Sequence, residues 1–210
     1  MKEISRGLTA VLLVFTMIFS FTGCGEINKA EKTVNGLFAS LKQADLEKIS
    51  EYMNVADLMN AGDEEDSFIS NPETFMQSMF KQLDYKIVSS EKIDNSTVEV
   101  TVDITNIDMK PVFTDFFARA IQYAFSSSLS SAQQPTEEET SQKMEEMFIE
   151  SVTKPNLATV TNTAVITVVK GEDKVWNIES DDDFLNALLG GMYDAIQTIQ
   201  LKTALAALNK

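Results

Sequence analysis

The sequence predicts an α+β fold, in which helices come first, an antiparallel sheet follows, and a pair of helices interrupts the sheet. Apolar residues recur every three to four positions between residues 29 and 83, as in helices that pack on one side. From residue 84 to residue 105 the period falls to two, the pattern of strands with one buried face. That period returns at residues 157–179, after a stretch with helical spacing.

Three helical segments are expected near the start. The first covers residues 29–43, whose apolar face is Ala30, Val34, Leu37, Phe38 and Leu41. Asp45 can cap the second, because a carboxylate at this position accepts hydrogen bonds from free backbone amides. The inner face of that second helix would be Leu46, Ile49, Tyr52 and Met53. A brief helical piece at 55–59 and a charged loop at 62–66 follow.

A further helix is expected to begin at Asn71-Pro72, since proline is well tolerated at the first helical position. Its apolar stripe is Phe75, Met76, Met79, Phe80 and Leu83. A strand at 84–92 and a turn at Asp94-Asn95 come next. The following strand alternates polar residues with Val98, Val100, Val102 and Ile104. These two strands are expected to pair as an antiparallel hairpin with one solvated face.

A helical hairpin is expected at about residues 111–151, inserted between strands. Pro111 would open its first helix, whose broad apolar face is Val112, Phe113, Phe116, Phe117, Ala120, Ile121, Ala124 and Phe125. Residues 126–135 are polar and rich in serine, which predicts a flexible loop. The second helix, at 136–151, is acidic and would make contact through Met144, Met147 and Phe148.

The longest strand is expected at 157–170. Ala164, Ile166 and Val168 lie on one face and Val165 and Val169 on the other, so part of this strand should be central and covered on both sides. A turn at 171–173 leads to a return strand at 174–179, which carries Trp176 and Ile178. Asp181–Asp183 would cap a helix that breaks at Gly190-Gly191, and an extra C-terminal helix would start near Met192.

The composition excludes several classes of function. The 210-residue chain has a formal charge of −15, which repels nucleic acid phosphates, so no nucleic-acid partner is expected. It contains no histidine, which rules out Ser-His-Asp and Cys-His hydrolases and imidazole-based zinc sites. Cys24 is the only cysteine, so no intramolecular disulfide can form.

The N-terminus carries an export signal. Lys2 and Arg6 precede a 14-residue, mostly apolar run at 8–21, which is short for a transmembrane helix of about 20 residues. The run ends in Phe21-Thr22-Gly23-Cys24, which resembles the lipobox of bacterial lipoproteins. The resemblance implies a signal peptide at 1–23, a diacylglyceryl group on Cys24 and a location on the extracytoplasmic face of the cell membrane. An uncleaved anchor and cleavage without lipid are the alternatives.

The mature chain is expected to comprise a lipidated tether at 24–29 and one domain at 30–210. The helix Val34–Leu41 followed by Asp45–Lys48, the run 98–108, the segment 174–178 and the closing 181–191 give it a familiar pattern. The chain resembles lipoproteins of Gram-positive bacteria with a nuclear transport factor 2-like (cystatin-like) domain, many of unknown function. The resemblance covers most of residues 30–190. It implies a curved antiparallel sheet packed against the N-terminal helices around a conical apolar cavity.

The leading expectation for function is non-catalytic binding of a small apolar ligand, a peptide or an envelope protein, without a cofactor or metal. The helix faces carrying Met76, Met79, Met144, Met147 and Phe113–Phe117 could form an adjustable apolar groove, although such stripes also form ordinary cores. A purely structural partner with a filled interior is another possibility.

The alternative is an isomerase-like or lyase-like enzyme with an aspartate base and a tyrosine in the conical cavity. Candidates for these roles are Asp84, Tyr85, Asp103, Asp108 and Tyr123. The acidic clusters at 63–66, 137–139 and 181–183 lack the spacing of a calcium-binding loop, so no metal site is expected.

Overall fold

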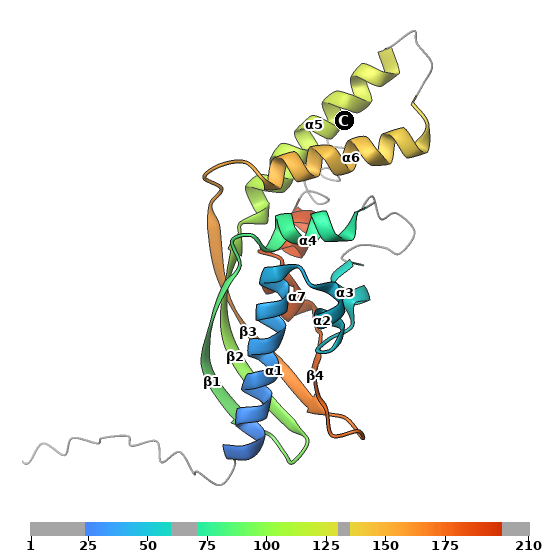
Figure 1. Cartoon of the computed structure of the whole chain (residues 1–210). Helices are drawn as coiled ribbons and strands as arrows, with labels where there is room; N and C mark the ends of the chain where they lie inside the picture. Colours follow the sequence, from blue (N-terminus) through green and yellow to red (C-terminus); the bar gives the residue numbers. More distant parts are fainter. Residues whose placement is uncertain (1–23, 60–70, 130–134, 199–210) are drawn as a thin grey trace, which may run out of the picture.

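The computed structural model describes residues 24–59, 71–129 and 135–198. A curved antiparallel sheet forms one layer, a long helix lies along its concave side, and a helical hairpin projects from one end (Figure 1). The four strands are β1 (Asp84–Lys92), β2 (Thr97–Ile107), β3 (Thr159–Lys170) and β4 (Trp176–Glu179), in the order β1-β2-β3-β4. The α+β class and the antiparallel sheet are therefore confirmed.

β1 and β2 form the predicted hairpin, with Asp84 opposite Thr105 and Lys92 opposite Val98. A bulge between Ile87 and Ser89 shifts the register of β1 once. On β2 the predicted alternation is confirmed, because its inward side chains are all fully buried: Val98, Val100, Val102 and Ile104. β2 pairs with β1 on one side and β3 on the other, so it lies in the interior of the sheet.

Helix α1 (Cys24–Gln43) starts earlier than expected. The predicted tether at 24–29 is its first part, so that prediction is corrected. Two contacts account for the helical start. Glu26 in the first turn lies 3.6 Å from the ammonium of Lys92, where a carboxylate also opposes the helix dipole. Ile27 packs against the hydrophobic core.

The next helices begin at the expected residues, but the first of them is shorter than expected, because it ends before Tyr52 and Met53. Asp45 caps α2 (Leu46–Ser50) by accepting a hydrogen bond from the backbone of Lys48 at 3.1 Å. Helix α3 is Val55–Met59, and α4 (Pro72–Phe80) begins at its proline with Asn71 as the cap. The apolar stripe of α4 is buried as predicted. The charged loop predicted at 62–66 lies outside the described residues.

Side chains from α1 and the sheet meet in one continuous core. Leu37, Phe38 and Leu41 of α1 are fully buried, and the ring of Phe38 stacks on that of Tyr85 with centroids 4.2 Å apart. Across from them lie the inward residues of β2 and, on β3, Ala164, Ile166 and Val168, all buried.

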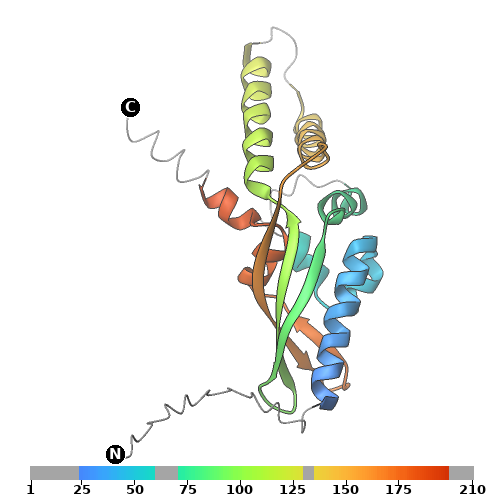
Figure 2. The same ribbon diagram turned by 90° about the vertical axis from the view of Figure 1, so that its left-hand side faces the viewer.

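The helical hairpin consists of α5 (Met109–Leu129) and α6 (Glu137–Val152), with α5 extending well beyond the sheet (Figure 2). Residues 126–129, predicted as loop, are helical. The hydroxyls of Ser126 and Ser128 donate to backbone carbonyls one turn earlier, at 2.9 and 2.8 Å, and so remain satisfied inside a helix. Thr136 caps α6 in a reciprocal arrangement with Glu139.

Only the N-terminal part of α5 is buried. Phe113 and Phe116 pack against Phe148 of α6, with ring centroids 5.7–5.8 Å apart. Ile121, Phe125 and Leu129, farther along α5, are exposed to solvent. The broad apolar face of this helix is therefore partly uncovered.

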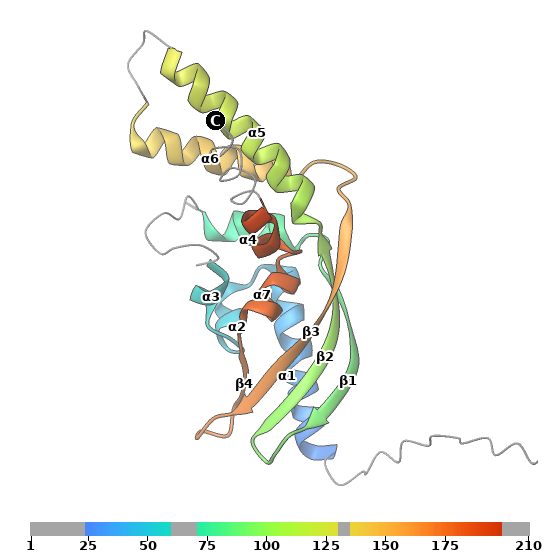
Figure 3. The same ribbon diagram turned by 180° about the vertical axis from the view of Figure 1, so that it is seen from behind.

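Part of β3 is predicted to be central and covered on both faces. The central position is confirmed, but the coverage of both faces is wrong. β3 lies between β2 and β4, but Val165 on its outer face is 45% exposed. The outward residues next to it are polar, so solvent covers this face. Helix α7 (Asp182–Leu188) packs against β3 and β2, and Asp181 caps it (Figure 3). Residues 192–198 are helical, and the rest of the predicted last helix lies outside the described residues.

Candidate functional site

Cys24, the predicted lipidation site, is the first residue of α1. The end of α1 at which the helix begins lies opposite the α5–α6 hairpin (Figure 1). The predicted signal peptide, residues 1–23, lies outside the described residues. In the part of the chain that the structure describes, no helix is both long enough and apolar enough to cross a membrane.

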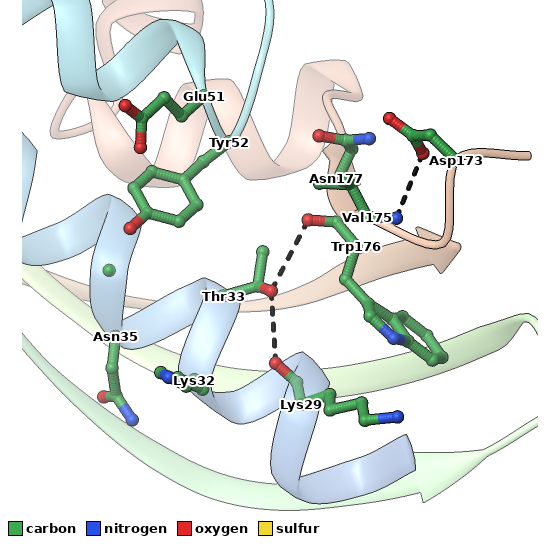
Figure 4. Close-up of a pocket in the computed structure, with 11 residues that line it drawn as sticks. Lys29, Lys32, Thr33, Asn35, Glu51, Tyr52, Asp173, Val175, Trp176 and Asn177 are labelled. Atoms are coloured by element: carbon green, nitrogen blue, oxygen red, sulfur yellow. Dashed lines mark hydrogen bonds between the residues drawn. The ribbon is translucent and has the colours of Figure 1, made fainter. Parts of the chain in front are cut away.

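An open pocket of about 850 Å³ lies between α1, the residues after α2, and the turn leading into β4 (Figure 4). Charged and amide side chains from segments far apart in sequence surround it. Its lining comprises Lys29, Lys32, Thr33, Asn35, Gly36, Glu51, Tyr52, Asp173, Val175, Trp176 and Asn177.

Three interactions hold the walls of the pocket together. The hydroxyl of Thr33 bonds the carbonyl oxygens of Lys29 at 3.1 Å and Trp176 at 3.5 Å, which joins α1 to β4. The backbone amide of Ile178 donates to the carbonyl of Tyr52 at 2.8 Å. The ring of Tyr52 lies so close to Gly36 that a β-carbon there would be 2.5 Å from it, so glycine is needed for this approach.

The pocket offers charges of both signs. Lys29 and Lys32 supply ammonium groups from α1, and Glu51 and Asp173 supply carboxylates from the facing segments. Asn177 adds an amide. The indole Nε1 of Trp176 is buried and has no hydrogen-bond partner among the described residues. This arrangement suits recognition of a polar, amide-rich surface.

The aspartates and tyrosines considered for catalysis do not converge, and none of them lines this pocket. Asp84 pairs with Lys42 at 2.9 Å, which lowers the pKa of its carboxyl. The neighbouring Tyr85 donates its hydroxyl to Asn35 at 2.6 Å, and burial raises the pKa of this phenol. A carboxyl with a lowered pKa is a weak base near neutral pH, the opposite of what the reaction needs.

The other candidates are equally dispersed. Asp103 lies on the outer face of the sheet and accepts a hydrogen bond from Thr163 at 2.7 Å. Asp108 accepts from the backbone of Lys110 at 3.0 Å where α5 begins, and Tyr123 lies far along α5. Among the described residues, no group of three or more Cys, Asp or Glu side chains could hold a metal ion.

A smaller pocket of about 380 Å³ lies between β3 and α7. Its walls include Asn162, Asp181, Asp183 and Asn186. Sequence analysis identified neither pocket. Lysines on an amphipathic helix usually lie in solvent and do not indicate a site. Only the fold brings Lys29 next to Trp176, so the sequence alone does not show the pocket.

No protein-family model matches the chain, and no curated protein matches it. The chain is similar to a crystal structure of the proposed lipoprotein ycdA from Bacillus subtilis, with 16% sequence identity and a TM-score of 0.38. The match covers 55% of this chain and 35% of the other, which is too partial for a function to be transferred from it.

Proposed function

We propose that this chain is an extracytoplasmic lipoprotein, anchored by a diacylglyceryl group on Cys24, that binds another envelope protein without catalysis. Its domain is proposed to be nuclear transport factor 2-like (cystatin-like) and of Gram-positive origin. The long N-terminal helix on a curved antiparallel sheet supports the first of these assignments.

The anchor is supported by the order of features at the N-terminus. A positive start, a short apolar run and small residues precede the only cysteine of the chain. Helix α1 then begins at that cysteine. The first described helix therefore begins at the residue before which a lipoprotein signal peptidase would cut.

The observation that carries the partner-binding role is the continuous core between α1 and the sheet. The inward side chains of α1, β2 and β3 are buried there and belong to one cluster. A carrier of a small apolar ligand needs a largely apolar cavity. The pocket beside α1 is open and presents ammonium, carboxylate and amide groups, which suits a peptide segment of a partner protein.

The anchor is tested by metabolic labelling. Cells producing the full chain are grown with radiolabelled palmitate, and the wild type is compared with Cys24→Ser. We expect label and membrane sedimentation for the wild type and loss of both in the variant. Equal labelling of the two proteins would refute the anchor.

Partner binding is tested by site-specific photo-crosslinking in the same cells. A photoreactive phenylalanine at Asn177 or Lys32 is placed in the pocket, and one at Lys86 on the outer side of β1 serves as the matched control. We expect both pocket positions to give the same discrete protein adduct and the control position to lack it. Adducts that are identical at all three positions, or no protein adduct from the pocket, would contradict the proposal.

A further inference from the structure

Three segments meet at the end of the molecule where α1 begins. They are the first turns of α1 (residues 24–32), the β1–β2 turn (93–96) and the β3–β4 turn (171–175), and they lie together in Figures 1 and 3. We call this surface the base.

Contacts tie the three segments of the base to one another. The ammonium of Lys92 lies 3.6 Å from the carboxylate of Glu26, which joins the first hairpin to α1. The backbone amide of Lys170 donates to the carbonyl of Ser96 at 2.7 Å, which joins the two hairpins. The base is therefore one surface of defined shape rather than three independent loops.

Both turns of the base expose an aliphatic side chain. Ile93 is 51% exposed and Val175 is 47% exposed. Turn positions usually carry Gly, Pro, Asn, Asp or Ser, so two exposed branched aliphatics at neighbouring turns need a reason. Burial in an apolar neighbour would supply one.

Charges of both signs lie on the base or directly beside it. Five lysines lie on it or directly beside it, namely Lys29, Lys32, Lys92, Lys170 and Lys174. Six carboxylates accompany them, from Glu26, Glu31, Glu91, Asp94, Glu172 and Asp173. Lysines and carboxylates are thus nearly balanced on this surface.

We propose that the base is the surface that lies against the phospholipid bilayer, an inference that rests on the lipid anchor proposed above. Because α1 begins at Cys24, no linker separates the lipid from this surface. Ile93 and Val175 then enter the headgroup region, and Lys170 and Lys174 extend their stems along it to reach phosphates.

The occupant is a bilayer rather than a second protein because the anchor residue is continuous with the patch. Two exposed aliphatic side chains would not hold the protein on a membrane by themselves. The lipid supplies the attachment, and the base sets which way the body points. The α5–α6 hairpin, at the opposite end, then projects away from the bilayer (Figure 1).

The orientation can be measured with Trp176, the only tryptophan of the chain, which follows Val175 directly. The mature chain, beginning at Cys24, is coupled through its single thiol to a maleimide phospholipid in phosphatidylcholine–phosphatidylglycerol vesicles. Some of the lipids carry brominated acyl chains, which quench tryptophan at short range. The matched probe is Phe125→Trp combined with Trp176→Phe, which moves the tryptophan to the far hairpin. We expect quenching of Trp176 to exceed that of the hairpin probe severalfold.

A second pair of variants leaves Trp176 in place. Ile93→Asp with Val175→Asp should reduce the quenching severalfold. Val88→Asp with Val165→Asp, which alters similarly exposed valines outside the base, should leave it unchanged. Equal quenching of the two tryptophan positions, or no effect of the Ile93 and Val175 changes, would overturn the proposal. Chemical coupling makes this outcome independent of palmitate labelling in cells, so failure of the anchor and failure of the orientation are read separately.

Discussion

Gly190 packs directly against the backbone carbonyl of Ile107, with no room for a side chain between them. The contact joins the chain after α7 to the end of β2, and the amide of Met109 donates to the carbonyl of Gly190 at 3.0 Å. Gly190 also has a φ of +63°, a left-handed conformation that glycine adopts without strain.

Gly190→Ala is expected to destabilise the protein by at least about 2 kcal/mol, because backbone strain and a steric overlap add together. Urea unfolding followed by Trp176 fluorescence measures the loss. Gly191→Ala is the control, since Gly191 has a φ of +78° but no atom near its missing β-carbon. Its cost should be about 1 kcal/mol, from the backbone alone. Equal losses would show that the contact with Ile107 is unimportant.

Asp115 on α5 joins the two helices of the α5–α6 hairpin. Its carboxylate accepts a hydrogen bond from Ser151 at 2.8 Å and pairs with Lys154 at 2.7 Å and Arg119 at 3.1 Å. Asp115→Asn removes the charge and keeps the shape. We expect a loss of roughly 1 kcal/mol at pH 7, because the side chain is partly exposed and its ion pairs are screened.

The same substitution should have a pH signature. The contacts with Lys154 and Ser151 lower the pKa of Asp115 below its usual 3.8, so the folded state favours the charged form. This contribution is present above pH 3.8 and disappears as the pH falls through the folded pKa. The melting temperatures of the wild type and Asp115→Asn should therefore converge once the pH falls below the folded pKa of Asp115. Glu146→Gln, in an exposed pair with Lys143, should track the wild type throughout, and a pH-independent gap for Asp115→Asn would contradict this account.

The packed interior can be tested at Phe38. Phe38→Ala removes a fully buried ring that stacks on Tyr85 and should cost about 3–5 kcal/mol. Calorimetry of the variant gives the loss in melting temperature and unfolding enthalpy. The control, Phe125→Ala, removes an exposed ring on α5 and should change the free energy of unfolding by no more than about 0.5 kcal/mol. A small effect at Phe38 would indicate a loosely filled interior and would favour a carrier of apolar ligands.

Asn106 connects β2 to α7. Its buried amide donates to the carbonyl of Leu188 at 2.8 Å. Asn106→Leu leaves that carbonyl unpaired, which should cost about 1–3 kcal/mol. Hydrogen exchange of the α7 amides should accelerate in this variant and remain unchanged in Asn95→Ala, in the exposed β1–β2 turn. Unaltered protection of α7 after Asn106→Leu would mean that other contacts hold the helix.

Local features of the fold could be predicted because they depend on neighbours in sequence. Asp45 and Asp181 cap helices as expected, and Asn71 caps the helix expected to begin at Pro72. Each accepts a hydrogen bond from an amide three residues ahead. The buried face of β2 could also be predicted, because successive residues of a strand point to opposite faces. The prediction fails where residues typical of loops satisfy their hydrogen bonds inside a helix instead. The serines of 126–129 look like loop residues but bond within α5.

Features that depend on distant segments could not be predicted. The apolar character of Val165 suggests burial, but the arrangement of the described helices leaves it 45% exposed on the outer face of β3. The pocket likewise depends on the packing of α1 against β4, where Thr33 meets the carbonyl of Trp176 across 143 positions of sequence separation. Cys24 was identified from local sequence alone, and its lipidation stays a prediction.

Because α1 starts at Cys24, a lipid there fixes how far the pocket lies above the membrane as well as the orientation of the body. At 1.5 Å of rise per residue, Lys29 to Asn35 lie about 8 to 17 Å along the helix from the first residue. With a lipid on Cys24, the pocket beside them opens just above the headgroups and cannot sample the space farther out. Its encounters would then occur by lateral diffusion, with molecules that share the same leaflet or touch it, and at the raised local concentration that confinement to a plane provides.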